Sequence, residues 1–211
     1  MEKSHSYDVL YISYDGLLDP IAQSQIIPYI EGLSKRNFKC IILSFEKSYA
    51  FYKNAQLAQT ETTLNLSEIK WGKLKYHKNP TVFATTLDIL QGCVYSLWLI
   101  KRYRVKILHA RSYVASSIAI ILQKICKIKF IFDMRGFWAD ERVEAGIWKN
   151  RGWLYKISKY LEKKFLCNAD WVISLTQTAK NQIKNDPYLR NKDIHISCIP
   201  TCVDLSKFRY T

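Results

Sequence analysis

The order of hydrophobic and polar positions divides this chain into short apolar runs and longer segments with helical periodicity. Seven apolar runs rich in β-branched residues have the length of strands: residues 8–13, 40–44, 70–77, 105–109, 129–133, 171–175 and 194–199. Six helical segments lie between them: residues 24–36, 49–59, 81–103, 114–126, 153–167 and 176–185. Continuous apolar strands separated by helices are typical of a parallel sheet covered on both faces. The sequence therefore predicts an α/β fold with a doubly wound, Rossmann-like parallel sheet, formed as one domain by residues 1–200.

In such sheets ligands bind at the carboxyl ends of the strands, so the residues after each strand carry most of the functional information. Three of these loops concentrate carboxylates, arginines, amides and aromatic side chains: residues 14–25, 110–113 and 133–142. Because parallel strands end at the same edge of a sheet, we expect residues 15–25, 109–113 and 133–144 to line one cleft.

The first of these loops is not a dinucleotide-binding turn, because Asp, Pro and Ala stand at positions 19, 20 and 22, where that motif needs glycines. A loop that leads into a helix near Ser24 can still offer backbone N–H groups to an anion. The side chains of Gln23, Ser24 and Gln25 suit hydrogen bonds to sugar hydroxyls. The alternative is an ordinary strand-to-helix turn with Ser24 as the N-cap.

The third loop holds six charged residues within twelve positions, interleaved with Phe137 and Trp138. The charged residues are Asp133, Arg135, Asp140, Glu141, Arg142 and Glu144. Carboxylates bind sugar hydroxyls or accept a proton, arginine binds phosphate through paired hydrogen bonds, and aromatic faces pack on sugar rings. Asp133 directly follows a buried strand, so partial desolvation makes it the better candidate for a base. A solvated loop with an internal Arg–Asp salt bridge is the alternative.

The histidines and cysteines show no metal-binding pattern. The four histidines are dispersed, and the six cysteines include no C-x-x-C pair, so neither a disulfide framework nor a zinc site is expected. His109 stands apart because it closes the strand at residues 105–109. A strand-end histidine is more often structural than catalytic, but the neighbouring Arg111 at the same sheet edge strengthens the functional interpretation.

The composition favours a folded protein with an anionic partner. The 211 residues are 48% hydrophobic and 24% charged, which argues against wholesale disorder. Lys and Arg number 32 against 18 Asp and Glu, and the formal net charge of +14 suits a phosphate-bearing substrate, a membrane surface or a nucleic acid. Compositional drift in a chain rich in Ile and Lys is the alternative. A nucleic-acid partner is not expected, because the strands lack the basic and aromatic pattern of an RNA-binding sheet.

Two basic segments suit contact with a membrane surface. No acidic residue occurs from position 89 to position 132, a stretch that holds eight Lys or Arg. In the predicted helix over residues 153–167, Lys156, Lys159 and Lys163 line one face and apolar side chains share another. A core-facing helix with a solvated back gives the same pattern. We expect the surface around residues 101–104 and 156–163 to bind anionic membranes weakly.

The sequence predicts neither a targeting segment nor a membrane-spanning segment. The N-terminus is polar and leads into a strand without the apolar region of a signal peptide. Two of the longest stretches without Asp, Glu, Lys or Arg, residues 89–100 and 112–123, have 12 residues each, whereas a spanning helix needs about 20 apolar residues. Both are predicted to be buried helices. The expected location is the cytoplasm, either free or peripheral on the inner face of the cell membrane.

Five stretches, which together span nearly the whole chain, resemble a known family. They are residues 14–28, 109–113, 132–142, 169–176 and 199–208. In these stretches the sequence is similar to the N-terminal domain of glycosyltransferase family four, whose enzymes have the GT-B fold. The run Phe132-Asp-Met-Arg-Gly-Phe-Trp-Ala-Asp-Glu-Arg142 is quite specific. The last stretch is a familiar signature of the segment that leads into the second domain.

The resemblance implies retaining transfer of a sugar from a nucleotide-sugar donor, without a required metal or other cofactor, in the synthesis of surface polysaccharide or glycolipid. The N-terminal domain of the family mainly holds the acceptor, here a lipid-linked or free saccharide, and its first loop approaches the donor phosphates. Asp133 matches the position that contacts the transferred sugar and His109 is the neighbouring candidate, so these two are the expected catalytic residues. The expected substrate-binding residues are Asp15, Gly16, Gln23, Ser24, Gln25, Arg111, Arg135, Trp138, Asp140 and Glu141.

The chain departs from the pattern of the family at three points. Ala22 stands where relatives often have Gly, so a phosphate is expected to approach the backbone less closely here. Thr201-Cys202 stand where many relatives have Asn-Gly, so the turn at these residues is expected to differ. Residues 201–211 are expected to begin the crossover to a second, nucleotide-binding domain outside this chain. We therefore expect the chain to be an acceptor-binding half that is inactive without a C-terminal donor-binding domain, either because it is truncated or because it needs a separate C-terminal-half chain. The alternative is a non-catalytic binding module that docks on a membrane or on another transferase.

Overall fold

The computed structural model describes residues 6–47, 54–189 and 192–201. The seven strands in this part of the chain form one parallel sheet in the order β3-β2-β1-β4-β5-β6-β7. They are β1 (Val9–Ser13), β2 (Cys40–Glu46), β3 (Lys70–Lys75), β4 (Ile107–Arg111), β5 (Lys129–Met134), β6 (Trp171–Ser174) and β7 (Ile196–Cys198). The predicted Rossmann-like parallel sheet is confirmed. Its strand order reverses between β1 and β4, which is where sheets of this class bind ligands.

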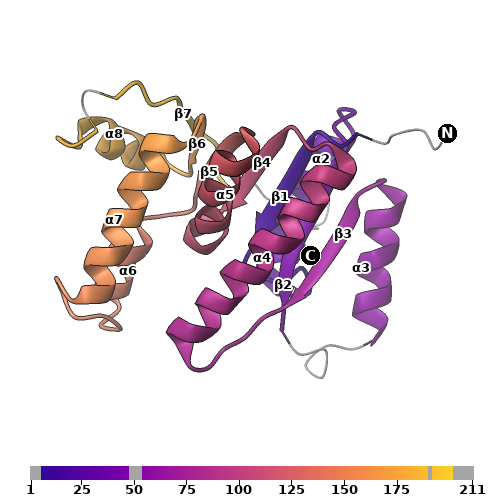
Figure 1. The fold of residues 1–211 in the computed structure, drawn as a ribbon, viewed down its shortest axis with the longest axis horizontal. Coiled ribbons are helices and arrows are strands. Elements are labelled where there is room, and N and C mark those ends of the chain that lie inside the picture. Colours follow the sequence, from indigo (N-terminus) through magenta and orange to yellow (C-terminus); the bar gives the residue numbers. More distant parts are fainter. Residues whose placement is uncertain (1–5, 48–53, 190–191, 202–211) are drawn as a thin grey trace, which may run out of the picture.

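Helices cover both faces of the sheet (Figure 1). Those in the described ranges are α1 (Pro20–Gln25), α2 (Ile27–Ser34), α3 (Asn54–Leu66), α4 (Thr81–Tyr103), α5 (Ser112–Cys126), α6 (Trp138–Glu144), α7 (Trp153–Asn168) and α8 (Gln177–Asn185). On one face, Ile30 of α2 and Leu64 of α3 share a core cluster with Ile42 of β2. On the other face, α4, α5 and α7 cover a cluster that includes Phe132 of β5 and Phe165 of α7.

The central strands contribute to both core clusters, which explains why their sequences are apolar throughout. All five residues of β1 and all seven of β2 are buried. Leu10 and Ile12 belong to the cluster under α4 and α5, whereas Val9 and Tyr11 belong to the cluster under α2. Successive side chains of a strand point to opposite faces, so a sheet covered on both sides needs apolar residues at consecutive positions.

Several element boundaries differ from the prediction. The single helix predicted over residues 24–36 is two helices, α1 and α2, and each has a proline, Pro20 or Pro28, in its first turn. β5 extends to Met134, so Asp133 lies within the sheet rather than after it. The polar loop predicted next contains the short helix α6. The helix predicted over residues 49–59 lies partly outside the described residues, and α3 is described from Asn54.

The prediction of a buried helix over residues 89–100 is wrong for much of that stretch. It lies in α4, where Leu90, Val94 and Trp98 are at least half exposed. By length and composition α4 could also cross a membrane, with a mean hydropathy of 1.3 over 18 residues, of which 33% are buried. α5, by contrast, buries most of the apolar stretch 112–123 against the sheet.

Candidate functional site

The candidate site lies where β1, β4 and β5 end side by side. In the sheet register Ser13 of β1 pairs with Arg111 of β4, and Arg111 pairs with Asp133 of β5. His109 precedes Arg111 by two residues, so both side chains leave the sheet on the same face. The sheet thus brings together residues that are far apart in the sequence, at the point where the strand order reverses.

Two arginines converge on one amide group at this edge. Arg111 and Arg135 each donate through Nη2 to Oε1 of Gln25, at 2.9 Å in both cases. Arg111 Nε also lies 3.5 Å from a carboxylate oxygen of the half-exposed Asp15. Arg135 Nη2 donates to Oγ1 of Thr201 at 2.9 Å. Two guanidinium groups therefore share a neutral acceptor, and an anionic group of a ligand would be a stronger acceptor for both.

A buried carboxylate and imidazole lie next to the arginines. Asp133 and His109 are 5% and 2% exposed, and Asp133 Oδ2 lies 3.7 Å from His109 Nε2. His109 Nε2 and Asp133 Oδ1 have no hydrogen-bond partner among the described residues. The rings of Tyr11 and Tyr29 flank the imidazole, with centroids 4.6 and 5.6 Å away. Buried polar atoms are nearly always paired, so these two atoms indicate a place for a ligand hydroxyl or a water molecule.

The surroundings favour the ionised form of Asp133. Burial by itself would raise the pKa of this carboxyl, but His109, Arg135 and Arg111 together lower the pKa below its ordinary value of 3.8. Arg135 Nη1 lies 3.6 Å from Asp133 Oδ1. Burial, with a smaller contribution from Asp133, raises the pKa of Tyr29 to about 12, so that hydroxyl stays neutral. An ionised carboxylate of low pKa accepts hydrogen bonds and stabilises positive charge, but it is a weak base.

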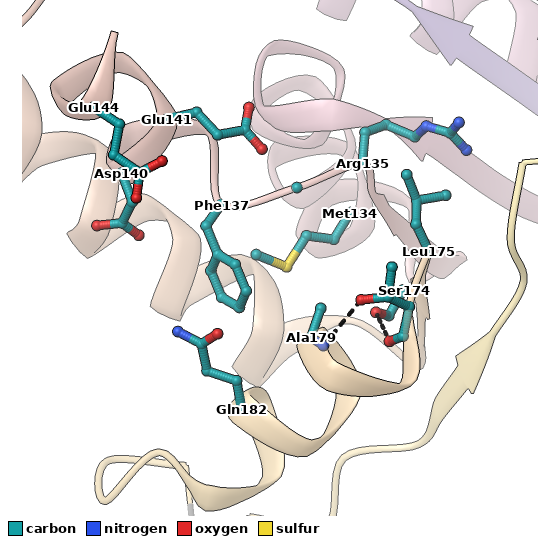
Figure 2. Close-up of a pocket in the computed structure, with 12 residues that line it drawn as sticks. Met134, Arg135, Phe137, Asp140, Glu141, Glu144, Ser174, Leu175, Ala179 and Gln182 are labelled. Carbon is teal, nitrogen blue, oxygen red and sulfur yellow. Dashed lines mark hydrogen bonds between the residues drawn. The ribbon is translucent and has the colours of Figure 1, made fainter. Parts of the chain in front are cut away.

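A pocket of about 520 Å³ opens beside Arg135 (Figure 2). Its walls come from the segment after β5, from α6, from the end of β6 and from α8: Met134, Arg135, Gly136, Phe137, Asp140, Glu141, Glu144, Ser174, Leu175, Thr176, Ala179 and Gln182. Figure 2 shows Phe137 and Met134 between the carboxylates of α6 and the turn around Ser174. An apolar centre with carboxylate, amide and hydroxyl groups around it suits a hydroxyl-rich ligand such as a sugar.

The predicted site residues in and around α6 have different surroundings. Asp140 accepts hydrogen bonds from the Tyr155 hydroxyl at 2.8 Å and from Lys159 Nζ at 2.9 Å, so it joins α6 to α7. The Trp138 ring packs against two other aromatic rings, with centroids 4.8 and 5.5 Å away. Glu141 is exposed and lines the pocket. The Glu141 carboxylate is thus open to a ligand, whereas Asp140 and Trp138 have partners within the fold.

The first loop is shaped by Glu46, a buried residue at the end of β2. Its carboxylate accepts hydrogen bonds from Leu17 N at 2.7 Å and from Ser44 Oγ at 2.6 Å. Gly16 packs against this carboxylate, since a Cβ at position 16 would lie 2.7 Å from Glu46 Oε2. The absence of a side chain at Gly16 therefore permits the close approach of this loop to the Glu46 carboxylate.

Gln23 and Ser24 bind groups of the fold rather than the arginines. Gln23 Nε2 donates to Leu17 O at 2.7 Å and to Thr60 Oγ1 at 3.0 Å. Ser24 Oγ donates to Pro20 O at 3.0 Å, within its own helix. Ser24 is not the predicted N-cap, because α1 begins at Pro20 after the N-cap residue Asp19. Of the three adjacent polar residues, Gln25 is the one that the structure joins to both arginines.

Sequence reasoning did not find Glu46, the role of Thr201 as a partner of Arg135, or the polar residues after β6. An acidic residue at the end of an otherwise apolar strand was an available signal for Glu46. Thr176 and Gln182 follow the carboxyl end of β6, so the rule that located the first three loops also applies to this one. Among the residues that the structure describes, no three His, Cys, Asp or Glu side chains gather in a way that could hold a metal ion.

The fold and the site together define an α/β protein with a cluster of charged and polar side chains at the carboxyl ends of the central strands of a parallel sheet. Comparison with protein families makes this specific: the sequence profile of Glycosyltransferase Family 4 matches residues 26–207, which is most of the chain. The chain belongs to this family. The expected resemblance is therefore confirmed, although the profile match begins after the loop at residues 14–25. A comparison with curated protein sequences gives no match.

Solved structures of GT-B glycosyltransferases share this fold over part of their length. A glycosyltransferase from Rickettsia africae has 19% identity and a TM-score of 0.57, and the match covers 92% of this chain and 43% of that one. Sucrose-phosphate synthase from Thermosynechococcus elongatus has 11% identity and a TM-score of 0.63, covering 95% and 49%. Anabaena HepE, solved with UDP and glucose, has 11% identity and a TM-score of 0.52, covering 95% and 46%. The chain thus spans less than half the length of each of these three proteins.

Proposed function

We propose that this chain forms the acceptor side of a retaining glycosyltransferase that takes its sugar from a nucleotide-sugar donor. The observation that carries the proposal is the buried Asp133–His109 pair beside two arginines at the strand ends, with two polar atoms that make no hydrogen bond among the described residues. Membership in Glycosyltransferase Family 4 supports the class of reaction. The proposed acceptor is a saccharide or a lipid-linked saccharide of surface polysaccharide or glycolipid synthesis, modified on the cytoplasmic side of the membrane.

In this proposal Asp133 acts as a charge-stabilising acceptor rather than as a strong base. Its low pKa keeps the carboxylate ionised, which suits a hydrogen bond from a sugar hydroxyl and stabilisation of positive charge on the transferred sugar. His109 Nε2 provides a second polar atom beside it, able to donate to or accept from the same ligand. Arg111 and Arg135 would exchange Gln25 for an anionic group, such as a phosphate of the donor or of a lipid-linked acceptor.

The pocket beside Arg135 is the proposed place for the acceptor saccharide. Its volume of about 520 Å³ lies in the range of small-molecule sites. Glu141 and Gln182 can bind hydroxyl groups, and the Phe137 ring offers an apolar surface to the face of a sugar. The pocket shares Arg135 with the cluster around Asp133, so an acceptor bound here would lie next to the proposed reacting groups.

The proposed donor site needs a second domain. The solved GT-B proteins are about twice as long as the matched region, and HepE was solved with UDP and glucose. We propose that such a domain, in the same polypeptide or in a separate chain, binds most of the nucleotide. Residues 1–211 alone would then bind nucleotide sugars weakly and transfer sugar negligibly, because donor and acceptor are not held together.

Ligand titration tests the binding part of this proposal. Calorimetry with oligosaccharides and nucleotide sugars should show weak binding to the wild-type chain, and Arg135→Ala should weaken it by about tenfold or more. The matched control is Lys106→Ala, which removes a cation at the opposite edge of the sheet, where Lys106 pairs with Asp8 at 2.9 Å. Equal affinity of the Arg135 and Lys106 variants for every ligand would overturn the assignment of the site.

A non-catalytic module that docks on a membrane or on another transferase is the second candidate function. The exposed apolar side chains of α4 favour it, since they indicate a binding surface away from the strand ends. The two functions differ in what Asp133 does. A docking module with Asp133→Asn would still bind its membrane or its partner transferase fully, whereas a transferase with the same substitution would lose catalysis.

A further inference from the structure

The outer surface of α4 is apolar along most of the helix. The exposed residues from position 81 to position 100 are all uncharged. Six of them are large and apolar, and we call them the apolar stripe: Val82, Phe83, Leu87, Leu90, Val94 and Trp98. The stripe extends over about 24 Å at the rise of an α-helix. Figure 1 shows α4 lying across the sheet, with one side turned away from it.

The inner surface of α4 has the opposite composition. Ala84, Asp88, Gly92 and Ser96 are buried at four-residue spacing. A surface helix normally buries its large apolar residues and exposes its polar ones, and α4 reverses this over about three turns, from Ala84 to Ser96, before Leu99 and Ile100 are buried at its C-terminal end. Phe83 and Val94 are 78% and 72% exposed, which leaves most of their apolar area to another partner.

Asp88 keeps α4 on the sheet. Its buried carboxylate accepts hydrogen bonds from the Tyr14 hydroxyl at 2.8 Å and from the His77 backbone N–H at 3.1 Å, and His77 Nδ1 lies 2.6 Å away. If α4 left the fold to cross a bilayer, it would carry this carboxylate into hydrocarbon without its partners, at a high cost. The helix is therefore suited to lie on a membrane and not to span it.

The charges around the apolar stripe select its partner. Lys78 precedes α4, and the exposed Lys101, Arg102 and Arg104 lie at its C-terminal end. The neighbouring α5 has no acidic residue and ends near the exposed Lys124 and Lys127, and its Ile121 and Ile125 extend the apolar surface. A second copy of the chain would bring the same positive charge to the contact, whereas anionic headgroups neutralise it.

We propose that the apolar stripe of α4 inserts into the interface of an anionic lipid bilayer, with the basic residues at its ends on the headgroups. This inference does not depend on the proposed sugar transfer. α4 follows β3 after five residues, so its Phe83 end lies toward the carboxyl edge of the sheet, where the candidate site is. If the proposed function also holds, this orientation presents the site to an acceptor carried by a lipid.

Co-sedimentation with vesicles tests the proposal. The chain should bind vesicles of phosphatidylcholine with phosphatidylglycerol more tightly than vesicles of phosphatidylcholine alone, and high salt should weaken the binding. Leu90→Glu with Val94→Glu should reduce partitioning into anionic vesicles by at least about tenfold. Phe83→Gln with Val94→Gln should reduce it without any change of charge, which separates insertion from simple electrostatic attraction.

The matched control places two glutamates on the opposite face of the sheet. Thr62→Glu with Leu66→Glu changes the net charge equally, on exposed positions of α3, and should keep nearly full binding. Circular dichroism and urea unfolding report whether each variant is folded. The proposal is overturned if the wild-type chain does not bind anionic vesicles, or if the α4 and α3 variants bind alike. Sedimentation that shows a dimer broken by the α4 variants, without vesicle binding, would assign the stripe to a second copy instead.

Discussion

Buried charged residues define the candidate site at the scale of single side chains. Asp133 lies near two arginines, and its Oδ1 makes no hydrogen bond among the described residues. Glu46 is also buried, but its oxygens accept hydrogen bonds from Leu17 and Leu18 of the first loop and from Ser44 of β2. Buried charged groups that bind no ligand normally have all of their hydrogen bonds satisfied within the fold. By this criterion Asp133 is suited to bind a ligand, whereas Glu46 stabilises the first loop.

We predict that Asp133→Asn flattens the acid dependence of stability. The folded pKa of Asp133 lies below 3.8, so its ionised form contributes stability that is present above the unfolded pKa and lost as the pH falls through the folded pKa. The free energy of unfolding of the wild-type chain should therefore fall more steeply than that of the variant below about pH 4. Urea unfolding at a series of pH values measures the two slopes. Parallel curves would contradict the lowered pKa.

Glu46→Ala should destabilise the chain by about 1–3 kcal/mol, because it leaves buried N–H groups of the first loop without an acceptor. The control is Glu61→Ala, which removes a partly exposed ion pair with Lys73 and should cost less than about 1 kcal/mol. Glu46→Gln retains an acceptor and should fall between the two. Chemical denaturation measures all three, and equal effects of the two alanine variants would show that Glu46 does not hold the loop.

At the scale of elements, the sequence pattern predicted what depends on local periodicity and missed what depends on the neighbours. The strands of the central sheet were found because burial on two faces demands unbroken apolar runs. The division of the first helix follows from Pro28, which favours the first turn of a helix over its interior. The sequence pattern did not predict that α4 buries small residues and exposes large apolar ones. Which side of the helix is buried depends on how it packs against the sheet and α5.

Two glycines in helices should respond in opposite ways to alanine. A Cβ at Gly92 of α4 would lie 2.4 Å from Ile118 Cδ1 of α5, so Gly92→Ala should cost about 1–3 kcal/mol through displaced packing. Gly32 of α2 has no atom within 4 Å of that position, so Gly32→Ala should stabilise the chain by about 0.5–1 kcal/mol. Thermal or urea unfolding of both variants checks the signs. Stabilisation by Gly92→Ala would mean that α4 does not pack closely on α5.

At the scale of the whole molecule, strand order makes the candidate site predictable in outline and unpredictable in detail. The expectation that loops after three strands lie near one another rested on the parallel sheet, and the structure brings Asp15, Gln25, Arg111, Asp133 and Arg135 to one edge. The separation of Gln25 from Gln23 and Ser24 depends on how α1 lies on the sheet. Sequence periodicity predicts neither the orientation of α1 on the sheet nor the hydrogen bond from Arg135 to Thr201.

The measurement that tests the central claim most directly is a transfer assay with a radiolabelled nucleotide sugar and an oligosaccharide or lipid-linked acceptor. Residues 1–211 should transfer negligibly alone and should gain activity when a matching C-terminal domain of the family is supplied. In the active combination, Asp133→Asn should reduce kcat by about 100-fold or more. Asp8→Asn, at the opposite edge of the sheet, should leave the rate nearly unchanged. Robust turnover by residues 1–211 alone, or equal rates for the two variants, would contradict this account of the chain as the acceptor side of a glycosyltransferase.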